Sequence, residues 1–296
     1  MVEQINYPRI NIQYNFTMRC NQHCSYCWFY KILNKKETYE PTIENIDTVI
    51  KHLKMYQIND FTVSGGEPSI NNKTLYLIDK IINELDCSRI KILTNAYNRK
   101  FFEELLKRYD TNKFYIYMAM HPQYYSQKYV DNYIFIKENF PEYTLSLLLD
   151  KRYKDNLLSF IPTYKQHFVG KTYFNGIRCA NDNPELGINY VFQQNEYNNL
   201  MFLKEIAEKY DISLSKDIIE WKRVPSIYHG KRCVNNFFFI NHDGTIKYDE
   251  ECFGKPTTQH NIYEEPYIFP YNETICHNTY QCWRMCIYDY VIHPEL

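Results

Sequence analysis

Three cysteines lie close together near the start of the chain, at Cys20, Cys24 and Cys27. Thiolates at this spacing can converge on one soft metal centre, either an iron–sulfur cluster or zinc. A structural site needs four ligands, so three protein ligands leave one coordination position open for a substrate. The spacing therefore favours a catalytic iron–sulfur cluster. The alternative is a zinc knuckle completed by His23 or by a distant cysteine.

A second motif, Ser64-Gly65-Gly66-Glu67-Pro68, follows the next predicted strand. Glycine is scarce, with eight in 296 residues, so the adjacent pair stands out. Glycine has no Cβ, which lets the backbone approach a ligand closely. Glu67 then offers an acceptor at the edge of the sheet where the cysteines lie. The sequence predicts that this turn and the cysteine loop share one site.

Together these motifs resemble those of the radical S-adenosylmethionine (SAM) enzymes. The CxxxCx(aromatic)C motif is carried by Cys20, Cys24, Tyr26 and Cys27, and the GGE motif by Gly65, Gly66 and Glu67. The order of strand, cysteine loop, helix, strand and GGE turn, followed by four more βα steps, resembles the partial barrel of that family over residues 9–180.

The resemblance implies definite roles. The three cysteines would hold a [4Fe–4S] cluster whose fourth iron is chelated by the amino and carboxylate groups of SAM. Glu67 would accept charge-assisted hydrogen bonds from the SAM ammonium beside the two glycines. Tyr26 would contact the adenine, and Thr94-Asn95 would face the cofactor. An electron donor such as flavodoxin or ferredoxin would reduce the cluster, and cleavage of SAM would give a 5′-deoxyadenosyl radical that abstracts hydrogen.

Two further residues are catalytic candidates. Relatives often have a serine for the ribose at the end of the fourth strand, whereas this chain has Met118-Ala119-Met120-His121. His121 is either a polar contact to SAM or substrate, or a structural residue. Cys179, at the end of the sixth predicted strand, is either a hydrogen donor to a product radical or a small buried hydrophobe.

A second group of cysteines lies near the end of the chain, and it resembles the SPASM/twitch extensions that carry auxiliary [4Fe–4S] clusters. Its members are Cys233, Cys252, Cys276, Cys282 and Cys286. Glu273 stands where the SPASM pattern has a cysteine, so one auxiliary cluster fits and two do not. The resemblance assigns Cys233, Cys252 and Cys286 as ligands, with Cys282 as the preferred fourth and Cys276 as the alternative. Zinc also suits four thiolates.

Hydrophobic periodicity predicts the elements that position these motifs. Strands are expected at 9–16, 60–63, 90–94, 114–120, 143–149 and 171–178, and helices at 41–56, 74–85, 99–109, 128–140, 156–168 and 196–210. Alternating strands and helices indicate a parallel α/β sheet, here a partial (β/α)6 TIM-like barrel. A doubly wound sheet is the competing architecture. It lacks support for a dinucleotide site because no GxGxxG follows a strand.

The pattern changes after residue 210. A β-hairpin is predicted around Asn241-His242-Asp243-Gly244, and the rest is rich in cysteine and proline. We therefore divide the chain into a radical SAM partial barrel at 1–210 and a small SPASM/twitch-like extension at 211–296.

Composition excludes several classes. Lys plus Arg is 34 and Asp plus Glu is 35, which argues against nucleic-acid and polybasic membrane binders. No membrane-length apolar run or signal peptide is present, so a cytoplasmic location is expected. In a reducing cytoplasm, ten cysteines favour metal or redox chemistry over disulfides.

The substrate is less constrained. A peptide or protein substrate is slightly favoured over dehydrogenation or epimerisation of a small molecule such as an aminosugar. About eight residues precede the first strand, so a leader peptide would need a separate recognition protein or direct docking. A non-catalytic zinc-binding interaction protein is the distant alternative.

Overall fold

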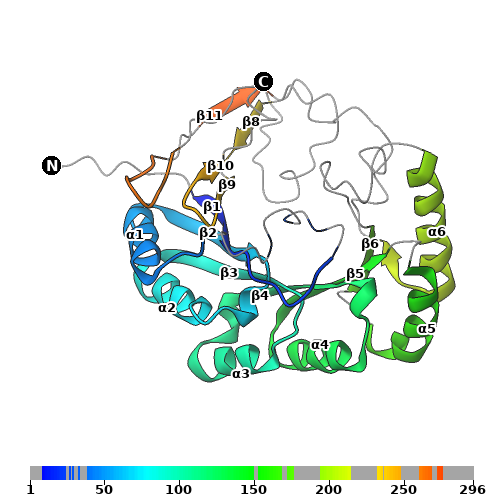
Figure 1. Ribbon diagram of the computed structural model, residues 1–296. Helices are drawn as coiled ribbons and strands as arrows, with labels where there is room; N and C mark the ends of the chain where they lie inside the picture. Colours follow the sequence, from blue (N-terminus) through cyan, green and yellow to red (C-terminus); the bar gives the residue numbers. More distant parts are fainter. Residues whose placement is uncertain are drawn as a thin grey trace.

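The computed structural model describes residues 9–24, 27, 29, 33, 39–149, 153–168, 172–176, 194–214, 232–235, 237–247, 260–268 and 272–275. Six parallel strands curve into a partial barrel, and helices cover its outer surface (Figure 1). The strands are β1 (Ile10–Thr17), β2 (Gln57–Gly65), β3 (Asp86–Thr94), β4 (Phe114–Met120), β5 (Glu142–Leu149) and β6 (Thr172–Gly176). The α/β partial barrel predicted from the sequence is confirmed.

The helices follow the strands in the predicted order, with ends displaced by a few residues. They are α1 (Ile43–Leu53), α2 (Thr74–Glu84), α3 (Arg99–Arg108), α4 (Gln127–Asn139), α5 (Lys154–Tyr164) and α6 (Gln194–Tyr210). Short 3-10 turns lie between them: η1 (Pro68–Ile70), η2 (Thr111–Lys113), η3 (Pro122–Tyr124) and η5 (Lys165–His167). Helix α1 begins at a capping box in which Thr42 and Asn45 satisfy each other's backbone N–H groups.

The predicted hairpin is present and joins the barrel sheet itself. Strand β9 (Phe237–Ile240) pairs with β10 (Ile246–Lys247) in antiparallel fashion and with β1 in parallel. At the opposite edge, β7 (Ser213–Leu214) pairs with β6. The described strands thus form one sheet in the order β10-β9-β1-β2-β3-β4-β5-β6-β7. A second sheet of β8 (Arg232–Asn235) and β11 (Asn272–Ile275) was not predicted.

The barrel strands alternate between an apolar outer face and a polar concave face, because successive side chains on a strand point to opposite sides. The outer face packs against the helices and includes Ile12, Tyr14, Phe61, Val63, Ile92, Ile116, Leu145 and Leu147, all buried. The concave face is mostly polar, with Asn11, Gln13, Asn15, Asp60, Thr62, Ser64, Arg89, Lys91, Tyr115, Tyr117, Thr144 and Ser146, and it carries Leu93, Ala119 and Leu148 toward the carboxyl ends of β3, β4 and β5. This polar interior is where a ligand would meet hydrogen-bonding groups.

Toward the amino-terminal ends of the strands, one buried acid pairs with two cations of the concave face. Asp60 accepts from Arg89 Nε at 2.7 Å and lies 2.5 Å from Lys91 Nζ. Burial by itself would raise the pKa of Asp60, but the bonds and charges of Arg89 and Lys91 lower it overall. Both cations also lie over the ring of Tyr115. This cluster links β2, β3 and β4 inside the barrel.

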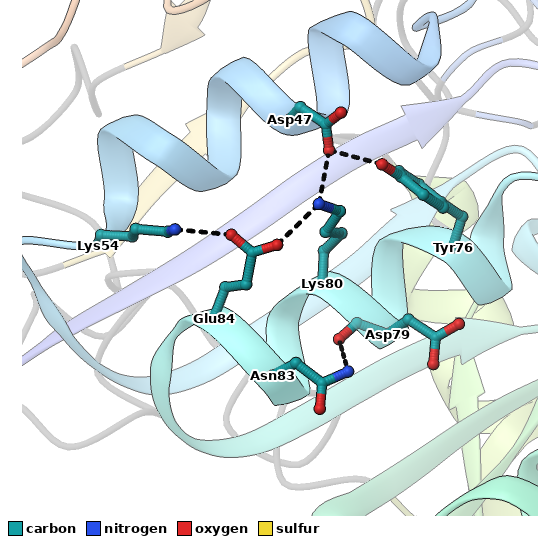
Figure 2. A network of polar contacts seen from close by, with 7 residues as sticks. All are labelled: Asp47, Lys54, Tyr76, Asp79, Lys80, Asn83 and Glu84. Atoms are coloured by element: carbon teal, nitrogen blue, oxygen red, sulfur yellow. Dashed lines mark hydrogen bonds and ion pairs between the residues drawn. The ribbon is translucent and has the colours of Figure 1, made fainter.

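On the outer surface, a polar network joins α1 to α2 (Figure 2). Lys80 bridges Asp47 of α1, at 3.1 Å, and Glu84 of its own helix, at 2.7 Å. Lys54 reaches Glu84 from the end of α1, and Tyr76 donates to Asp47. Exposed pairs contribute little individually, so the network mainly fixes how the two helices lie side by side. In the part of the chain that the structure describes, no helix combines the length and apolar character needed to cross a bilayer.

Candidate active site

The cysteine loop and the GGE turn leave the sheet from neighbouring strands at the same end. Strand β1 ends at Thr17 and β2 ends at Gly65. Two backbone hydrogen bonds join the segments: Gly66 N donates to Thr17 O at 2.5 Å, and Glu67 N donates to Arg19 O at 2.7 Å. The predicted convergence of the two motifs at one edge of the barrel is therefore present.

The two glycines are required by the protein's own backbone. A Cβ at Gly65, where φ is +120°, would lie 2.2 Å from Thr17 O. A Cβ at Gly66 would lie 2.2 Å from Arg19 O. The sequence suggested close approach to a ligand, whereas the close approach seen here is between the turn and the start of the cysteine loop. The glycines thus set how closely the two motifs dock.

Gly66→Ala is expected to lower the free energy of unfolding by roughly 3 kcal/mol, because the new methyl group must displace a backbone carbonyl. Urea denaturation of the whole chain measures this change. Ser146→Ala is a matched control, since the Ser146 hydroxyl is buried with no hydrogen-bond partner among the described residues. Its loss should change stability by less than about 0.5 kcal/mol. Equal stability of Gly66→Ala and wild type would contradict the close contact between the GGE turn and the start of the cysteine loop.

Glu67 is buried at the centre of this end of the barrel, with 1% of its surface exposed. Its Oε1 accepts from Ser69 N at 3.0 Å and from Thr94 Oγ1 at 2.6 Å, and its Oε2 accepts from Asn95 N at 2.6 Å. Burial raises the pKa of the carboxyl, although the bonds from Ser69, Thr94 and Asn95 oppose the shift. Glu67 therefore joins the turn after β2 to the end of β3.

Asn95 continues this chain of contacts to the cysteines. Its Nδ2 donates to Asn21 Oδ1 at 2.9 Å and lies 4.0 Å from Cys20 Sγ. Its Oδ1 accepts from Tyr97 N at 3.0 Å. The structure thus places Thr94 and Asn95 beside the two motifs with which the sequence grouped them.

The three thiols lie in a largely desolvated loop. Cys24 is buried, and Cys20 and Cys27 are half-buried. Burial raises the pKa of Cys20 to about 12 and also raises that of Cys27. Two backbone amides point at these sulfurs, from Gln22 to Cys20 and from Phe29 to Cys27, each at 3.4 Å. A bound cationic metal centre would favour the deprotonated thiolates, because its positive charge offsets the cost of burying their negative charge.

No group of three His, Cys, Asp or Glu side chains within the described ranges is arranged around a single metal ion. A cubane cluster would place each of the three protein thiolates on a different iron.

Two tyrosines hold the inner side of the cysteine loop. Tyr129 OH accepts from Gln22 Nε2 at 2.6 Å, and Tyr124 OH accepts from His23 N at 2.8 Å. Sequence reasoning missed these contacts, because the partners lie about a hundred residues apart and belong to no shared motif. They show that the loop after β4 and helix α4 also position the thiols.

Several predicted site residues lie outside the described residues: Tyr26, Cys179, Cys252, Cys276, Cys282 and Cys286. For Cys233 only the backbone is described, in β8, where it pairs with Thr274 of β11. The auxiliary site therefore stays a prediction, as does the division of the chain at residue 210.

His121 follows β4 directly and precedes η3. It is half-buried, and desolvation lowers its pKa to about 4. Because the folded-state pKa lies below the unfolded value, the neutral ring stabilises the fold above pH 6.5, and this contribution is lost as the pH falls toward 4.

Between pH 7 and pH 5, wild type is expected to lose about 2 kcal/mol more stability than His121→Asn. Urea denaturation at the two pH values measures the difference. Identical slopes for wild type and His121→Asn would show that His121 titrates normally in the fold.

Comparison with known proteins identifies the barrel. Residues 14–156 match the family model described as "Radical SAM superfamily". This part of the chain belongs to the radical SAM superfamily. The match includes both motifs and the loops that Glu67 and Asn95 hold together.

Curated relatives are similar over the same region. GTP 3′,8-cyclase of Alkaliphilus metalliredigens (strain QYMF) is 34% identical over 104 residues, which is 35% of this chain and 31% of that protein. S-adenosylmethionine-dependent nucleotide dehydratase of Fibrobacter sp. (strain UWH6) is 30% identical over 104 residues, 33% of this chain and 30% of the relative. The matched part of this chain thus spans about a third of each relative.

Solved structures are similar over most of the chain. Streptococcus suis SuiB bound to S-adenosylmethionine has a TM-score of 0.59 at 12% identity, covering 87% of this chain and 64% of SuiB. Histidine-tagged anSMEcpe with bound AdoMet also has a TM-score of 0.59, at 14% identity, covering 88% of this chain and 76% of that one. At these identities the similarity shows a shared fold.

Proposed function

We propose that this chain is a radical SAM enzyme that cleaves SAM reductively and removes hydrogen from a peptide or protein substrate. Cys20, Cys24 and Cys27 would hold a [4Fe–4S] cluster. The observation that carries the proposal is the direct contact between the cysteine loop, the GGE turn and Thr94-Asn95. The buried Glu67 carboxylate joins the turn to Thr94-Asn95, and the backbone of the turn and the side chain of Asn95 bond to the cysteine loop.

The residues present fit such a cluster. The thiols are desolvated, and backbone amides point at two of the sulfurs. When bound, the reduced cluster would supply one electron that breaks a carbon–sulfur bond of SAM, giving methionine and a 5′-deoxyadenosyl radical. The electron would come from flavodoxin or ferredoxin.

The chain's own residues would bind and enclose SAM. Glu67 would orient the ammonium of SAM, and the segment that Glu67 fixes, Thr94-Asn95, would line the same place. Tyr26 would contact the adenine, and His121 and Cys179 are candidates for contact with the substrate or its radical. The polar concave face would hold the substrate beside the thiols while the surrounding barrel excludes water.

A peptide substrate is supported by structural similarity over most of the chain. Among the similar structures are SuiB bound to the precursor peptide SuiA, with a TM-score of 0.54, and anSMEcpe with AdoMet and the Cp18Cys peptide, with a TM-score of 0.55. These similarities cover 87% and 88% of this chain, well beyond residue 156.

A nucleotide substrate is the second candidate, supported by the names of the curated relatives. A triphosphate needs several basic side chains. On the concave face of the described strands β1–β5, the basic residues are Arg89 and Lys91, and both pair with Asp60. The described barrel interior therefore suits an uncharged polar substrate better than a triphosphate. Dehydrogenation or epimerisation of a small molecule such as an aminosugar remains a further alternative.

The C-terminal cysteines would hold one auxiliary [4Fe–4S] cluster, with Cys233, Cys252, Cys282 and Cys286 as ligands and Cys276 as the alternative to Cys282. Support comes from the resemblance to SPASM/twitch extensions. With two cubanes, anaerobically reconstituted protein should hold about eight iron atoms. A colourless zinc protein would overturn the proposed function in favour of a zinc-binding interaction protein.

The substrate is tested by measuring 5′-deoxyadenosine after anaerobic reconstitution and reduction with dithionite. Two sets of additions are compared: short peptides encoded beside this protein's gene, and nucleoside triphosphates including GTP. Faster formation with a peptide, together with a mass change in that peptide, would support the proposal. Stimulation by a nucleotide alone would replace the peptide assignment, and no 5′-deoxyadenosine under any condition would overturn SAM cleavage.

A further inference from the structure

One carboxylate lies at the neck of the loop that carries the three thiols, which is where the chain leaves the barrel at residues 17–18 and returns at Glu40. The chain leaves the barrel after Thr17 and passes through the cysteine motif. It returns at Glu40, just before α1. Glu40 Oε1 accepts a hydrogen bond from Met18 N at 2.8 Å, a contact between residues 22 positions apart. Thr17 Oγ1 also lies against the carboxylate, at 3.1 Å from Oε2 and 3.2 Å from Oε1.

The same carboxylate reaches the segment that follows the GGE turn. Asn71 Nδ2 donates to Glu40 Oε2 at 3.0 Å. Beside it, Lys73 Nζ donates to Pro41 O at 2.6 Å, which gives the returning chain a second tie to this segment. Glu40 therefore joins the entry of the cysteine loop, its exit and the chain after β2.

The start of the cysteine loop is thus held from two sides. On one side, the carbonyls of Thr17 and Arg19 accept from the backbone of Gly66 and Glu67. On the other side, Glu40 accepts from Met18 N. Cys20 follows this held segment directly, so its placement depends on both sets of bonds. Closing the loop between Thr17 and Glu40 costs conformational entropy. Hydrogen bonds to an ionised acceptor such as the Glu40 carboxylate are stronger than those to a neutral one, and they offset part of this cost.

We propose that Glu40 is a positioning residue for the iron–sulfur site: by closing the neck of the cysteine loop it holds Cys20, Cys24 and Cys27 in the arrangement that binds the cluster. This role rests on the proposed function. Glu40 acts through the backbone of residues 17–19 and is assigned no contact with the cluster or SAM.

Glu40→Gln keeps the length of the side chain but turns one oxygen into a donor. That amide must then face another donor, either Met18 N or Asn71 Nδ2, so one neck bond is lost. Glu44→Gln is a matched control, because Glu44 is an exposed acid four positions further on, in the first turn of α1. Asn71→Asp is a second variant. It keeps the acceptor for Lys73 N but replaces the bond to Glu40 with repulsion between two carboxylates.

The experiment uses the full chain, reconstituted anaerobically with iron and sulfide. Two quantities are measured well below the unfolding temperature: the rate of iron loss to a chelator, and the electron paramagnetic resonance signal of the reduced cluster that responds to SAM. That signal reports the cluster at the three cysteines and not an auxiliary one. Thermal unfolding of the iron-free protein is recorded in parallel.

For Glu40→Gln we expect iron loss on the order of tenfold faster than in wild type, the change produced by losing one charge-assisted bond, and an altered SAM-responsive signal. Asn71→Asp should shift both measurements in the same direction, and Glu44→Gln should match wild type. A lower unfolding temperature with a wild-type signal and rate of iron loss in both neck variants would show that Glu40 only stabilises the fold. Wild-type protein that binds no iron would instead overturn the proposed function itself, and this role with it.

Discussion

Cys24→Ala is expected to reduce the formation of 5′-deoxyadenosine from SAM to background. Cys24 is the most buried of the three thiols, with 7% of its surface exposed, and it lies between the other two in the loop. Losing one of three protein ligands leaves an iron of the cluster with no protein sulfur to bind. Chromatography of the products after dithionite reduction measures the effect, and iron content should fall in parallel.

The matched control is Cys87→Ala. Cys87 is a half-buried thiol in β3, whose Sγ lies 3.3 Å from Arg89 O, outside the cysteine loop. This variant should retain wild-type iron content and cleavage of SAM. Circular dichroism should show both variants folded, because each substitution removes only one sulfur atom. Wild-type product formation by Cys24→Ala would refute the assignment of the cluster to this loop.

Glu67→Gln is expected to weaken SAM binding on the order of tenfold to a hundredfold while leaving the cluster in place. The carboxylate accepts from Ser69 N, Thr94 Oγ1 and Asn95 N in a fully buried setting. An amide at this position lacks the negative charge that would assist a hydrogen bond from the SAM ammonium, and a charge-assisted bond contributes roughly 1.5–3 kcal/mol. Direct titration of reconstituted protein with SAM measures the affinity.

The same substitution should lower the free energy of unfolding of the iron-free chain by about 1–3 kcal/mol, because a buried polar group loses its partner. Glu104→Gln is the control. Glu104 pairs with Lys107 and Arg108 on the surface of α3, so its loss should change neither SAM affinity nor stability appreciably. Unchanged SAM affinity in Glu67→Gln would mean that neither Glu67 nor the segment it holds faces SAM.

These two variants separate the roles of the two motifs. The cysteine loop is expected to decide whether a cluster is present, and Glu67 to decide how well SAM binds beside it. Glu67 is also a structural residue, since both of its oxygens already accept from the protein. Any contact with the SAM ammonium would add to these bonds, which is why the stability measurement accompanies the titration.

Much of the barrel could be predicted from the sequence, because the alternation of apolar residues follows the local period of each element. Strand residues such as Ile12, Tyr14 and Phe16 repeat every second position, and residues such as Ile46, Val49, Ile50 and Leu53 recur along α1. The two motifs were equally visible, because the residues that share a loop are neighbours in the chain. The parallel order then placed both motifs at one edge of the sheet.

Only the tertiary structure decided which distant residues hold that edge together. The bonds from Gln22 to Tyr129, from Asn95 to Asn21 and from Asn71 to Glu40 join segments with no sequence pattern in common. A period of 2 or 3.6 tells which face a side chain occupies, but the partner on that face depends on strand order and register across the sheet. For the same reason, the sequence predicted the β9–β10 hairpin but not its parallel pairing with β1, because a local turn fixes only the two strands it connects.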